Sequence, residues 1–390
     1  MPCEPVQLAY FKKLQNNEPM SLIEHTHIHT PAALTDLKNL TQEQLVLFVQ
    51  SLGQPAFRGR QILAWIYKPG ITDFPQMTDL AKEFRAVLAQ SACMSRFEEC
   101  IVECSQDGAV KFAFRLQDGQ IIESVLIPEE DRNTLCVSSQ VGCAMGCTFC
   151  LTGAMGFRRN LTTAEIINQV CAVRDWTIAH GKGPLTNIVF MGMGEPLANL
   201  DNLIDSISIL TEQRGLDFSN RRITVSTCGL VPQMMLLGEQ TDVNLAVSLH
   251  AADDAVRSTL MPINNRYPLA ELIEACQNYR QKRRKRIMFE YTLLEGVNDS
   301  NTDAEKLAAL LRDVPCKINL LSVNPVADSA FQSPSEHKIL RFQQILRNHG
   351  FTVFIRTSRG EDISAACGQL AGKGWDDAKV VLRGDTDNLG

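Results

Sequence analysis

Four cysteines lie within fifteen residues in the stretch CVSSQVGCAMGCTFC, which runs from Cys136 to Cys150. Three of them, Cys143, Cys147 and Cys150, have the spacing C-x3-C-x2-C. A closed structural zinc site takes four protein ligands, and a four-iron cluster also needs four. Three cysteines leave one iron open to the amino and carboxylate groups of a small molecule. The spacing favours such a cluster, and a structural zinc site with a remote fourth ligand is the alternative.

Single polar residues in apolar stretches are the next candidates for chemistry. Glu123 is the lone acid in IIESVLIP, and a buried carboxylate costs free energy unless it has a partner or faces water. An edge-strand glutamate is the ordinary alternative. His250 ends the stretch NLAVSLH, where a buried histidine bonded to backbone is the ordinary explanation. His25, His27 and His29 alternate in HTHIHT and could bind a metal from one face of a strand, but a polar tail is the favoured interpretation.

The local and the overall charge of the chain favour opposite conclusions about nucleic-acid binding. The basic run RQKRRKR at 280–286 ends a predicted helix, and such a run binds RNA phosphates without reading sequence. A solvated helix end explains it equally well. The net charge of the whole chain is −6, so any RNA substrate must be held by local basic patches.

Composition indicates an ordinary globular protein of more than one domain, with 390 residues, 45% hydrophobic and 21% charged. The N-terminal stretch MPCEPVQLAYFKKLQ lacks the apolar core of a signal peptide, and no run of about 18 apolar residues predicts a membrane span. The 13 cysteines are an odd number, and in a reducing compartment they indicate metal binding or catalysis more than disulfides. We therefore expect a cytoplasmic protein.

The first part of the chain is predicted to form helices followed by short strands. Residues 1–35 are expected to be a flexible extension, and 36–97 a small helical domain in which Thr41-x-x-Gln44 begins a helix as a capping box. Basic and aromatic residues in FRGRQILAWIYKPG could touch nucleic acid, although a solvated helix face accounts for them as well. In 98–130, Asp-Gly turns at 107–108 and 118–119 separate three strands and predict a β-meander.

Residues 131–375 alternate between strand and helix patterns, which predicts a parallel sheet or barrel with its chemistry at the carboxyl ends of the strands. Helix starts are marked by capping boxes at Thr162-x-x-Glu165 and at Ser333–Glu336, the second with a proline at the first helical position. Residues 376–390 are expected to be a tail. The predicted strands are NTLCVSSQ, TNIVFMG, RRITVST, VNLAVSLH, RIMFEYTLL, KINLLSV and FTVFIRT.

Three motifs together resemble a known family. CAMGCTFC resembles the cysteine signature of the radical S-adenosylmethionine (SAM) superfamily, and MGMGEP at 191–196 resembles its glycine-glutamate-proline motif. CGQLAG, within EDISAACGQLAGK, resembles one subfamily, the RNA adenine-C2 methyltransferases of the RlmN type and their C8-directed relative Cfr. The resemblance runs from about residue 40 onward. It implies an α/β fold, a partial (β/α)6 radical-SAM barrel with a helical, RNA-binding accessory domain at 36–97 and the β-meander at 98–130.

The resemblance also implies a mechanism and roles for three residues. Cys367 takes a methyl group from one SAM molecule, and a radical made from a second SAM molecule removes hydrogen from that methyl group. The carbon radical then joins the adenine ring, and Glu123 removes the proton from carbon 2. Cys136 frees the product by forming a disulfide with Cys367. Cys143, Cys147 and Cys150 would hold a [4Fe-4S] cluster.

The cofactors and partners implied by the resemblance complete the expectations. The cofactors are the [4Fe-4S] cluster and SAM; the partners are 23S rRNA, tRNA and a flavodoxin-type electron donor, with no membrane and a monomeric enzyme. The motifs do not separate methylation at carbon 2 from methylation at carbon 8, and the helical domain favours carbon 2. The residues expected to contact SAM are Gly194, Glu195, Ser226, Ser248, Leu249, His250 and Asn324.

Overall fold

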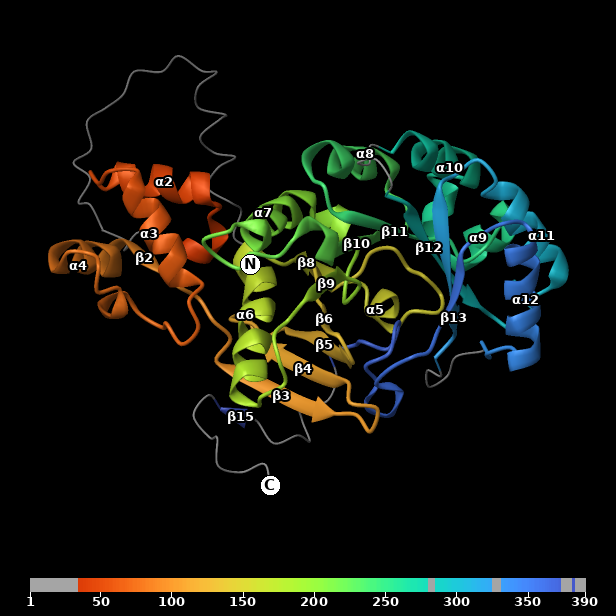
Figure 1. Cartoon of the computed structure of the whole chain (residues 1–390), viewed down its shortest axis with the longest axis horizontal. Helices are drawn as coiled ribbons and strands as arrows, with labels where there is room; N and C mark the ends of the chain where they lie inside the picture. Colours follow the sequence, from red (N-terminus) through yellow and green to blue (C-terminus); the bar gives the residue numbers. More distant parts are fainter. Residues whose placement is uncertain (1–33, 280–284, 325–330, 373–380, 383–390) are drawn as a thin grey trace, which may run out of the picture. The chain divides into compact units, whose positions relative to one another are not determined.

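A single eleven-stranded sheet forms the centre of the fold, in the order β14-β13-β12-β11-β10-β9-β6-β5-β4-β3-β15 (Figure 1). The structure is a computed structural model that describes residues 34–279, 285–324, 331–372 and 381–382. The alternating histidines at 25–29 and most of the basic run at 280–286 lie outside these residues. Within the described part, no helix is long and apolar enough to cross a membrane.

Seven neighbouring strands of this sheet are parallel. Their bounds are β6 Arg132–Cys136, β9 Asn187–Phe190, β10 Ile223–Thr227, β11 Asn244–Ser248, β12 Ile287–Leu293, β13 Cys316–Ser322 and β14 Val353–Arg356. Each of the first six is followed by helix, which gives six strand–helix units and a last strand at the sheet edge. The helices are α6 Thr163–Ala179, α7 Leu200–Thr211, α8 Val231–Gln240, α9 Asp254–Leu260, α10 Leu269–Asn278, α11 Asn301–Leu310 and α12 Glu336–Asn348. The expected partial (β/α)6 barrel is confirmed.

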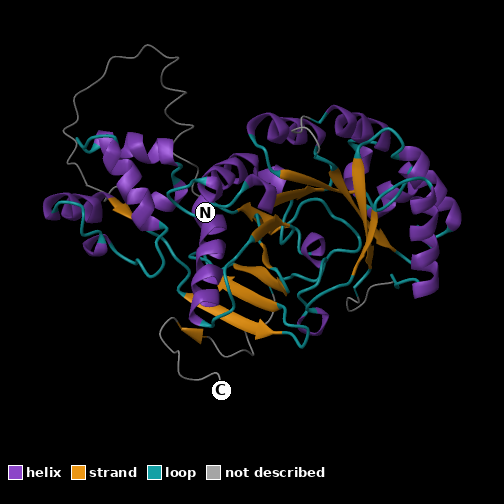
Figure 2. Ribbon diagram, viewed as in Figure 1, coloured by secondary structure: helices purple, strands orange, loops and turns teal. Residues whose placement is uncertain are grey.

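One face of the parallel strands is apolar, and the helices cover it from outside (Figure 2). Alternate residues of a strand share a face, and so do residues paired across parallel strands. The outer face therefore carries side chains that are at most 1% exposed, among them Ile188, Val225, Leu245, Phe289 and Ile318. Packing of this face against the helices fixes the register, because a shift of one residue would turn it to the opposite side.

The predicted meander is also confirmed, as β3 Glu99–Cys104, β4 Val110–Arg115 and β5 Ile121–Glu129 in antiparallel pairing. Sequence reasoning did not predict that β5 pairs with β6, which makes the meander part of the barrel sheet. At the far edge, β15 Val381–Leu382 pairs with β3. Helix α6 covers the meander as well as the barrel, since Trp176 packs edge-on against Phe112 at 5.2 Å between ring centroids.

The three-cysteine loop lies on the other side of the sheet from the helices. It begins at β7 Gln140–Gly142 and ends at β8 Phe157–Asn160, and these two strands pair with each other. Between them is the short helix α5 Leu151–Ala154, which lies inside the curve of the sheet (Figure 1). The loop is thus placed on the concave side of the barrel.

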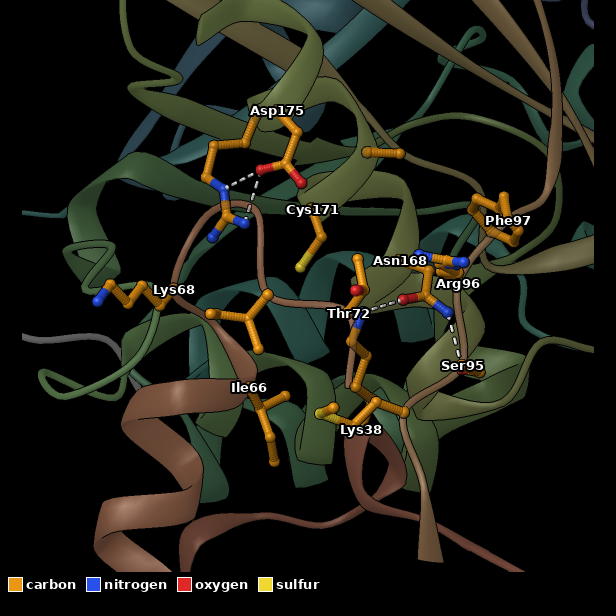
Figure 3. Close-up of a pocket in the computed structure, with 14 residues that line it drawn as sticks. Lys38, Ile66, Lys68, Thr72, Ser95, Arg96, Phe97, Asn168, Cys171 and Asp175 are labelled. Atoms are coloured by element: carbon orange, nitrogen blue, oxygen red, sulfur yellow. Dashed lines mark hydrogen bonds and ion pairs between the residues drawn. The ribbon is translucent and has the colours of Figure 1, made fainter. Parts of the chain in front are cut away.

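The N-terminal helices precede the sheet as α2 Gln42–Ser51, α3 Phe57–Ile66 and α4 Lys82–Ser91, flanked by the short parallel strands β1 Thr35–Asp36 and β2 Ala92–Cys93. The capping box of Thr41 and Gln44 is present as predicted. Buried polar contacts join this region to α6 around a cavity of about 30 Å³ (Figure 3). There Asn168 accepts a hydrogen bond from Lys38 Nζ at 2.7 Å and donates one to Ser95 Oγ at 2.9 Å.

The two capping boxes predicted in the barrel had different outcomes. The box at Thr162 and Glu165 forms and begins α6. The one at Ser333 does not form, because α12 begins at Glu336 with Ser335 as its N-cap and without a side-chain cap bond. Pro334 therefore precedes the helix and does not occupy its first turn.

Candidate active site

The inner face of the continuous sheet carries polar side chains from residues that are far apart in the sequence. Cys136 is paired with Val125 of β5, and Glu123 lies two residues before Val125, so Glu123 and Cys136 project from one face. The same face continues along the parallel strands through Ser226 of β10 and Ser248 of β11. Two predicted catalytic residues and two predicted SAM contacts are thereby aligned on the concave side.

The shape of the three-cysteine loop depends on glycine at its start. Gly142 has a φ of 70°, and a Cβ atom added there would lie 1.8 Å from the Gly156 carbonyl oxygen. That same oxygen accepts a hydrogen bond from the amide of Cys143 at 3.1 Å. The amide of Thr148 donates to the Leu260 carbonyl at 3.0 Å, which fastens the middle of the loop to the end of α9.

The donor set of this loop suits an iron–sulfur cluster. Burial, together with the charges of Glu195 and Cys150, raises the pKa of Cys143 to about 11 and that of Cys147 to about 12. Only a bound cation makes a set of neighbouring thiolates favourable at such a place. In the described residues, no three His, Cys, Asp or Glu side chains converge on a site for one ion. A four-iron cluster takes one cysteine at each of three irons and does not require that convergence.

The turn after β9 is held by its glycine and by a buried carboxylate. Gly194 has a φ of 98°, and a Cβ atom there would lie 2.5 Å from the Cβ of Gln140. Glu195 is 4% exposed, and its Oε2 accepts a hydrogen bond from the Cys228 amide at 2.8 Å. Its Oε1 accepts one from the Leu197 amide at 3.1 Å. Burial raises the pKa of Glu195, and these donors oppose that rise.

His250 lies against the three-cysteine loop, where its ring contacts both backbone and an aromatic side chain. Its Nδ1 accepts a hydrogen bond from the Thr292 amide at 2.9 Å, and its ring meets Phe149 edge-on at 4.8 Å between centroids. Burial and the nearby Arg257 lower the pKa of His250 to about 3, so the imidazole is neutral with its proton on Nε2. This is the backbone-bonded buried histidine that the sequence offered as the ordinary explanation.

The remaining predicted SAM contacts lie at the carboxyl ends of the strands. Leu249 is fully buried, and its amide donates to the Glu290 carbonyl at 3.0 Å. Ser226 and Ser248 are half-buried on the inner face. Asn324 follows β13 and donates from Nδ2 to the Cys367 carbonyl at 3.0 Å. Asn324 therefore joins this group of strand ends to the predicted methyl carrier.

The segment that carries Cys367 lies between the three-cysteine loop and the meander. On one side, the amide of Leu151 donates to the Gly368 carbonyl at 2.8 Å, and Thr152 Oγ1 donates to the Leu370 carbonyl at 2.6 Å. On the other side, Glu123 Oε2 accepts hydrogen bonds from the next two amides of the segment, those of Ala371 at 2.9 Å and Gly372 at 3.1 Å. Three regions distant in sequence thus converge on Cys367.

The two predicted catalytic thiols lie near each other and are both free. Burial and then the charge of Cys367 raise the pKa of Cys136 far above that of an ordinary thiol. Cys367 keeps access to solvent, yet protein surrounds it closely enough that desolvation and the charge of Glu290 raise its pKa to about 11. Residues 136 and 367, which are far apart in the sequence, therefore lie close enough for the charge of Cys367 to act on Cys136.

Three charged residues of this region were missed by sequence reasoning. Arg257 is fully buried and donates to the carbonyls of Leu249, Cys228 and Ser248, which joins the loops after β10 and β11. Glu290 accepts a hydrogen bond from Asn319 at 2.8 Å on the inner face of β12. It is the lone acid in RIMFEYTLL, the same signal that singled out Glu123.

The third missed residue, Lys111 of β4, lies beside Glu123. Its Nζ is 3.7 Å from Glu123 Oε1 and 2.6 Å from Glu103 Oε2. Strand alternation in VKFAFRL places Lys111 on one face with Arg115, so its face could be predicted from the sequence but its burial could not.

The barrel, its three-cysteine loop and the glycine-rich turn after β9 define a radical SAM protein, and residues 137–309 match the model of the radical SAM superfamily. Residues 35–94 match the N-terminal domain of ribosomal RNA large subunit methyltransferases. The chain belongs to the RlmN family of dual-specificity RNA methyltransferases, as its relatives establish. Membership of the superfamily implies a [4Fe-4S] cluster and SAM as cofactors.

Two relatives and one solved structure are similar over most of the chain. The dual-specificity RNA methyltransferase RlmN of Desulfotalea psychrophila is 61% identical over 86% of this chain and 94% of its own length. The RlmN of Geobacter sulfurreducens is 54% identical over 87% and 93%. The crystal structure of a radical SAM methyltransferase from Sphaerobacter thermophilus is 46% identical, covers 87% of this chain and all of that chain, and superposes with a TM-score of 0.81.

Proposed function

We propose that this chain methylates carbon 2 of adenine in 23S rRNA and in tRNA, with Cys367, Glu123 and Cys136 as its catalytic residues. The family supports RNA as the substrate. The observation that carries the residue assignment is the segment around Cys367, which is hydrogen-bonded to the three-cysteine loop on one side and to Glu123 on the other. A methyl carrier needs both neighbours, one for radical formation and one for proton removal.

Cys367 carries the methyl group in this proposal. Its thiolate attacks the SAM methyl carbon, a sulfur–carbon bond forms, and the sulfonium bond to the methyl group breaks. The solvent access of Cys367 suits this role, because a carrier must meet both SAM and an RNA base. Cys143, Cys147 and Cys150 would hold the cluster, which would supply the electron for cleavage of a second SAM molecule.

Glu123 and Cys136 complete the reaction once the carbon of Cys367 is joined to the base. Glu123 takes the proton from carbon 2, and one electron must leave the ring as well, which the oxidised cluster would accept when bound. The Cys136 thiolate then attacks the Cys367 sulfur to form a disulfide, and the carbon–sulfur bond breaks with its electron pair on the methylene carbon, which takes up a proton. Side chains that project from one face of two paired strands support this sharing of tasks.

The SAM-binding residues are proposed from the strand ends around the three-cysteine loop. We assign this role to the residues that the sequence singled out, with the backbone of the turn at Gly194 and Glu195 for the methionine end. Glu195 and His250 engage backbone amides through their side chains, which supports a part in fixing the shape of the pocket. The others are Ser226, Ser248, Leu249 and Asn324.

The domain and partner assignments remain part of the proposal. We assign 1–35 to an extension, 36–97 to RNA binding, 98–130 to the support of Glu123, 131–375 to the radical chemistry and 376–390 to a tail. A flavodoxin-type protein would reduce the cluster, and the enzyme would act as a monomer in the cytoplasm. An adenine must leave its stack to reach the concave side of the barrel, which costs a few kcal/mol and least in loops.

One experiment tests the proposed function directly. The anaerobically reconstituted protein is incubated with methyl-deuterated SAM and unmodified 23S rRNA or tRNA, and the nucleosides are then analysed by mass spectrometry. We expect deuterated 2-methyladenosine from both RNAs. Methyl groups at carbon 8 would instead establish the Cfr-type reaction, and the absence of any SAM cleavage would establish an RNA-binding iron–sulfur protein without this activity.

A further inference from the structure

We propose that Lys111 is a positioning residue that holds the Glu123 carboxylate in its ionised state and anchors the backbone that leads to Cys367. The inference rests on the proposed function, in which Glu123 is the base. Lys111 touches neither SAM nor RNA in this proposal. It acts through the residues that do the chemistry.

The position of Lys111 follows from the register of the meander. It is directly opposite Glu103 on β3 and Val125 on β5, and Glu123 lies two residues from Val125 on the same face. Its Nζ reaches Glu103 at 2.6 Å and Glu123 at 3.7 Å, and it also donates to the Ile363 carbonyl at 2.7 Å. One ammonium group thus connects three strands with the C-terminal segment.

Burial of this ammonium group requires partners. The Lys111 side chain is 7% exposed and that of Glu123 is 2% exposed, whereas Glu103 is 39% exposed. Lysine is almost never buried without pairing, because removing its charge from water costs several kcal/mol. Glu103 alone could pair with a lysine at the surface. The inward position of Lys111 is explained by the fully buried carboxylate and the carbonyl that it also contacts.

Lys111 has the larger part in keeping Glu123 ionised. Burial raises the pKa of Glu123, and the charge of Lys111 is the strongest influence that lowers it, ahead of the Gly372 and Ala371 amides. Glu103 on β3 acts weakly in the other direction. On the side of β6, the Ser138 hydroxyl donates to the backbone carbonyl of Glu123 and not to its carboxylate.

The hydrogen bond from Lys111 to the Ile363 carbonyl holds the backbone just before the segment that carries Cys367. Ile363 is the last residue of the short helix η6 Glu361–Ile363, four positions before Cys367. The next residue, Ser364, has a φ of 52°, so the chain reverses there in a conformation that favours glycine. The partly buried hydrogen bond from Lys111 Nζ to the Ile363 carbonyl holds this bend against the meander.

The test compares Lys111→Met with Lys111→Arg and with the wild type. The pH dependence of 2-methyladenosine formation is measured between about pH 6 and about pH 9, where the lower limb reports ionisation of the base. Without the charge of Lys111, the pKa of Glu123 rises, so Lys111→Met shifts the lower limb upward by roughly one to three pH units. The covalent protein–RNA adduct should accumulate at neutral pH in this variant, and Lys111→Arg should restore most of the wild-type profile.

Arg115→Met is the matched control, because Arg115 lies on the same face of β4 and pairs with Glu99 at 2.7 Å. It should leave the pH profile unchanged. SAM cleavage to 5′-deoxyadenosine without RNA reports whether each variant is folded and holds the cluster. Should Lys111→Met fail to fold, Lys111→Gln takes its place, because it removes the charge and keeps an N–H donor for the Ile363 carbonyl.

An unchanged profile in Lys111→Met or Lys111→Gln, or an equal loss at every pH in a variant that still cleaves SAM, would overturn the role of Lys111. The proposed function is tested separately, by the product that the wild type forms in the same assay.

Discussion

The amide of Leu151 donates a hydrogen bond to the carbonyl of Gly368 at 2.8 Å, and this contact joins the residue after Cys150 to the residue after Cys367. The predicted cluster ligand and the predicted methyl carrier are therefore held at a distance set by backbone. Radical transfer depends on such placement, since a misplacement of about 1 Å can cost a factor of about 10² in rate.

Gly368→Ala should reduce RNA methylation on the order of tenfold. Gly368 has a φ of 82°, and a Cβ atom there would lie 3.1 Å from the Phe149 carbonyl oxygen, so the segment must shift. Gly350→Ala is the control, because Gly350 has a φ of 88° with open space around it. The measurement is single-turnover methylation of an rRNA fragment. Equal effects in the two variants would mean that contact with the loop is unimportant.

Cys367→Ala should abolish methylation while SAM cleavage continues, because it removes the methyl carrier and leaves the three-cysteine loop intact. Cys104→Ala changes an exposed cysteine outside the site and should be fully active. Both variants are assayed for methylated nucleoside and for 5′-deoxyadenosine. Methylated RNA from Cys367→Ala at the wild-type rate would remove Cys367 from the mechanism.

Cys136→Ala should trap RNA covalently on the protein, since the bond between base and Cys367 forms but no thiol resolves it. Cys171→Ala is matched in burial, at 6% exposed against 8%, and lies on α6. Denaturing gels with labelled RNA separate adduct from free RNA. The finding of free product only, at the wild-type yield, would contradict the role of Cys136.

Glu290→Gln should make Cys367 more reactive toward alkylating reagents. Burial raises the pKa of Glu290 to about 7, so above neutral pH its charge opposes ionisation of the Cys367 thiol. Glutamine removes that charge and lowers the pKa of Cys367. While the pH is below this pKa, each unit by which the pKa falls increases the thiolate fraction, and with it the alkylation rate, about tenfold. Mass spectrometry of iodoacetamide labelling at Cys367 measures the rate. Glu271→Gln, on the exposed surface of α10, is the control and should leave the labelling rate of Cys367 unchanged.

Local patterns were sufficient to predict most elements of the fold. The strands around Cys136, Ser226 and Ser248 came from apolar runs bounded by turn residues, and the helix at Thr162 from a cap that depends on neighbouring residues only. The cap expected at Ser333 failed because proline fits equally well before a helix and in its first turn.

Contacts across long sequence separations could not be predicted in this way. Lys111 donates to a carbonyl 252 positions away, and nothing near Lys111 or Ile363 in the sequence signals the other. The buried state of Arg257 is of the same kind, because its partners are backbone carbonyls, which every residue has. Family resemblance named Glu123 and Cys367, but only the fold gave the amides that join them.

The pairing of β5 with β6 has a consequence for how RNA is chosen. Glu123 and Cys136 are on hydrogen-bonded neighbours of one sheet, whose strands lie about 4.8 Å apart, so no hinge can change the spacing between these strands. Adjustment between enzyme and substrate must then come from the nucleic acid. Such an active site favours RNAs that unstack a nucleotide at low cost, and it would accept two unrelated molecules provided that each presents an adenine in an easily deformed loop.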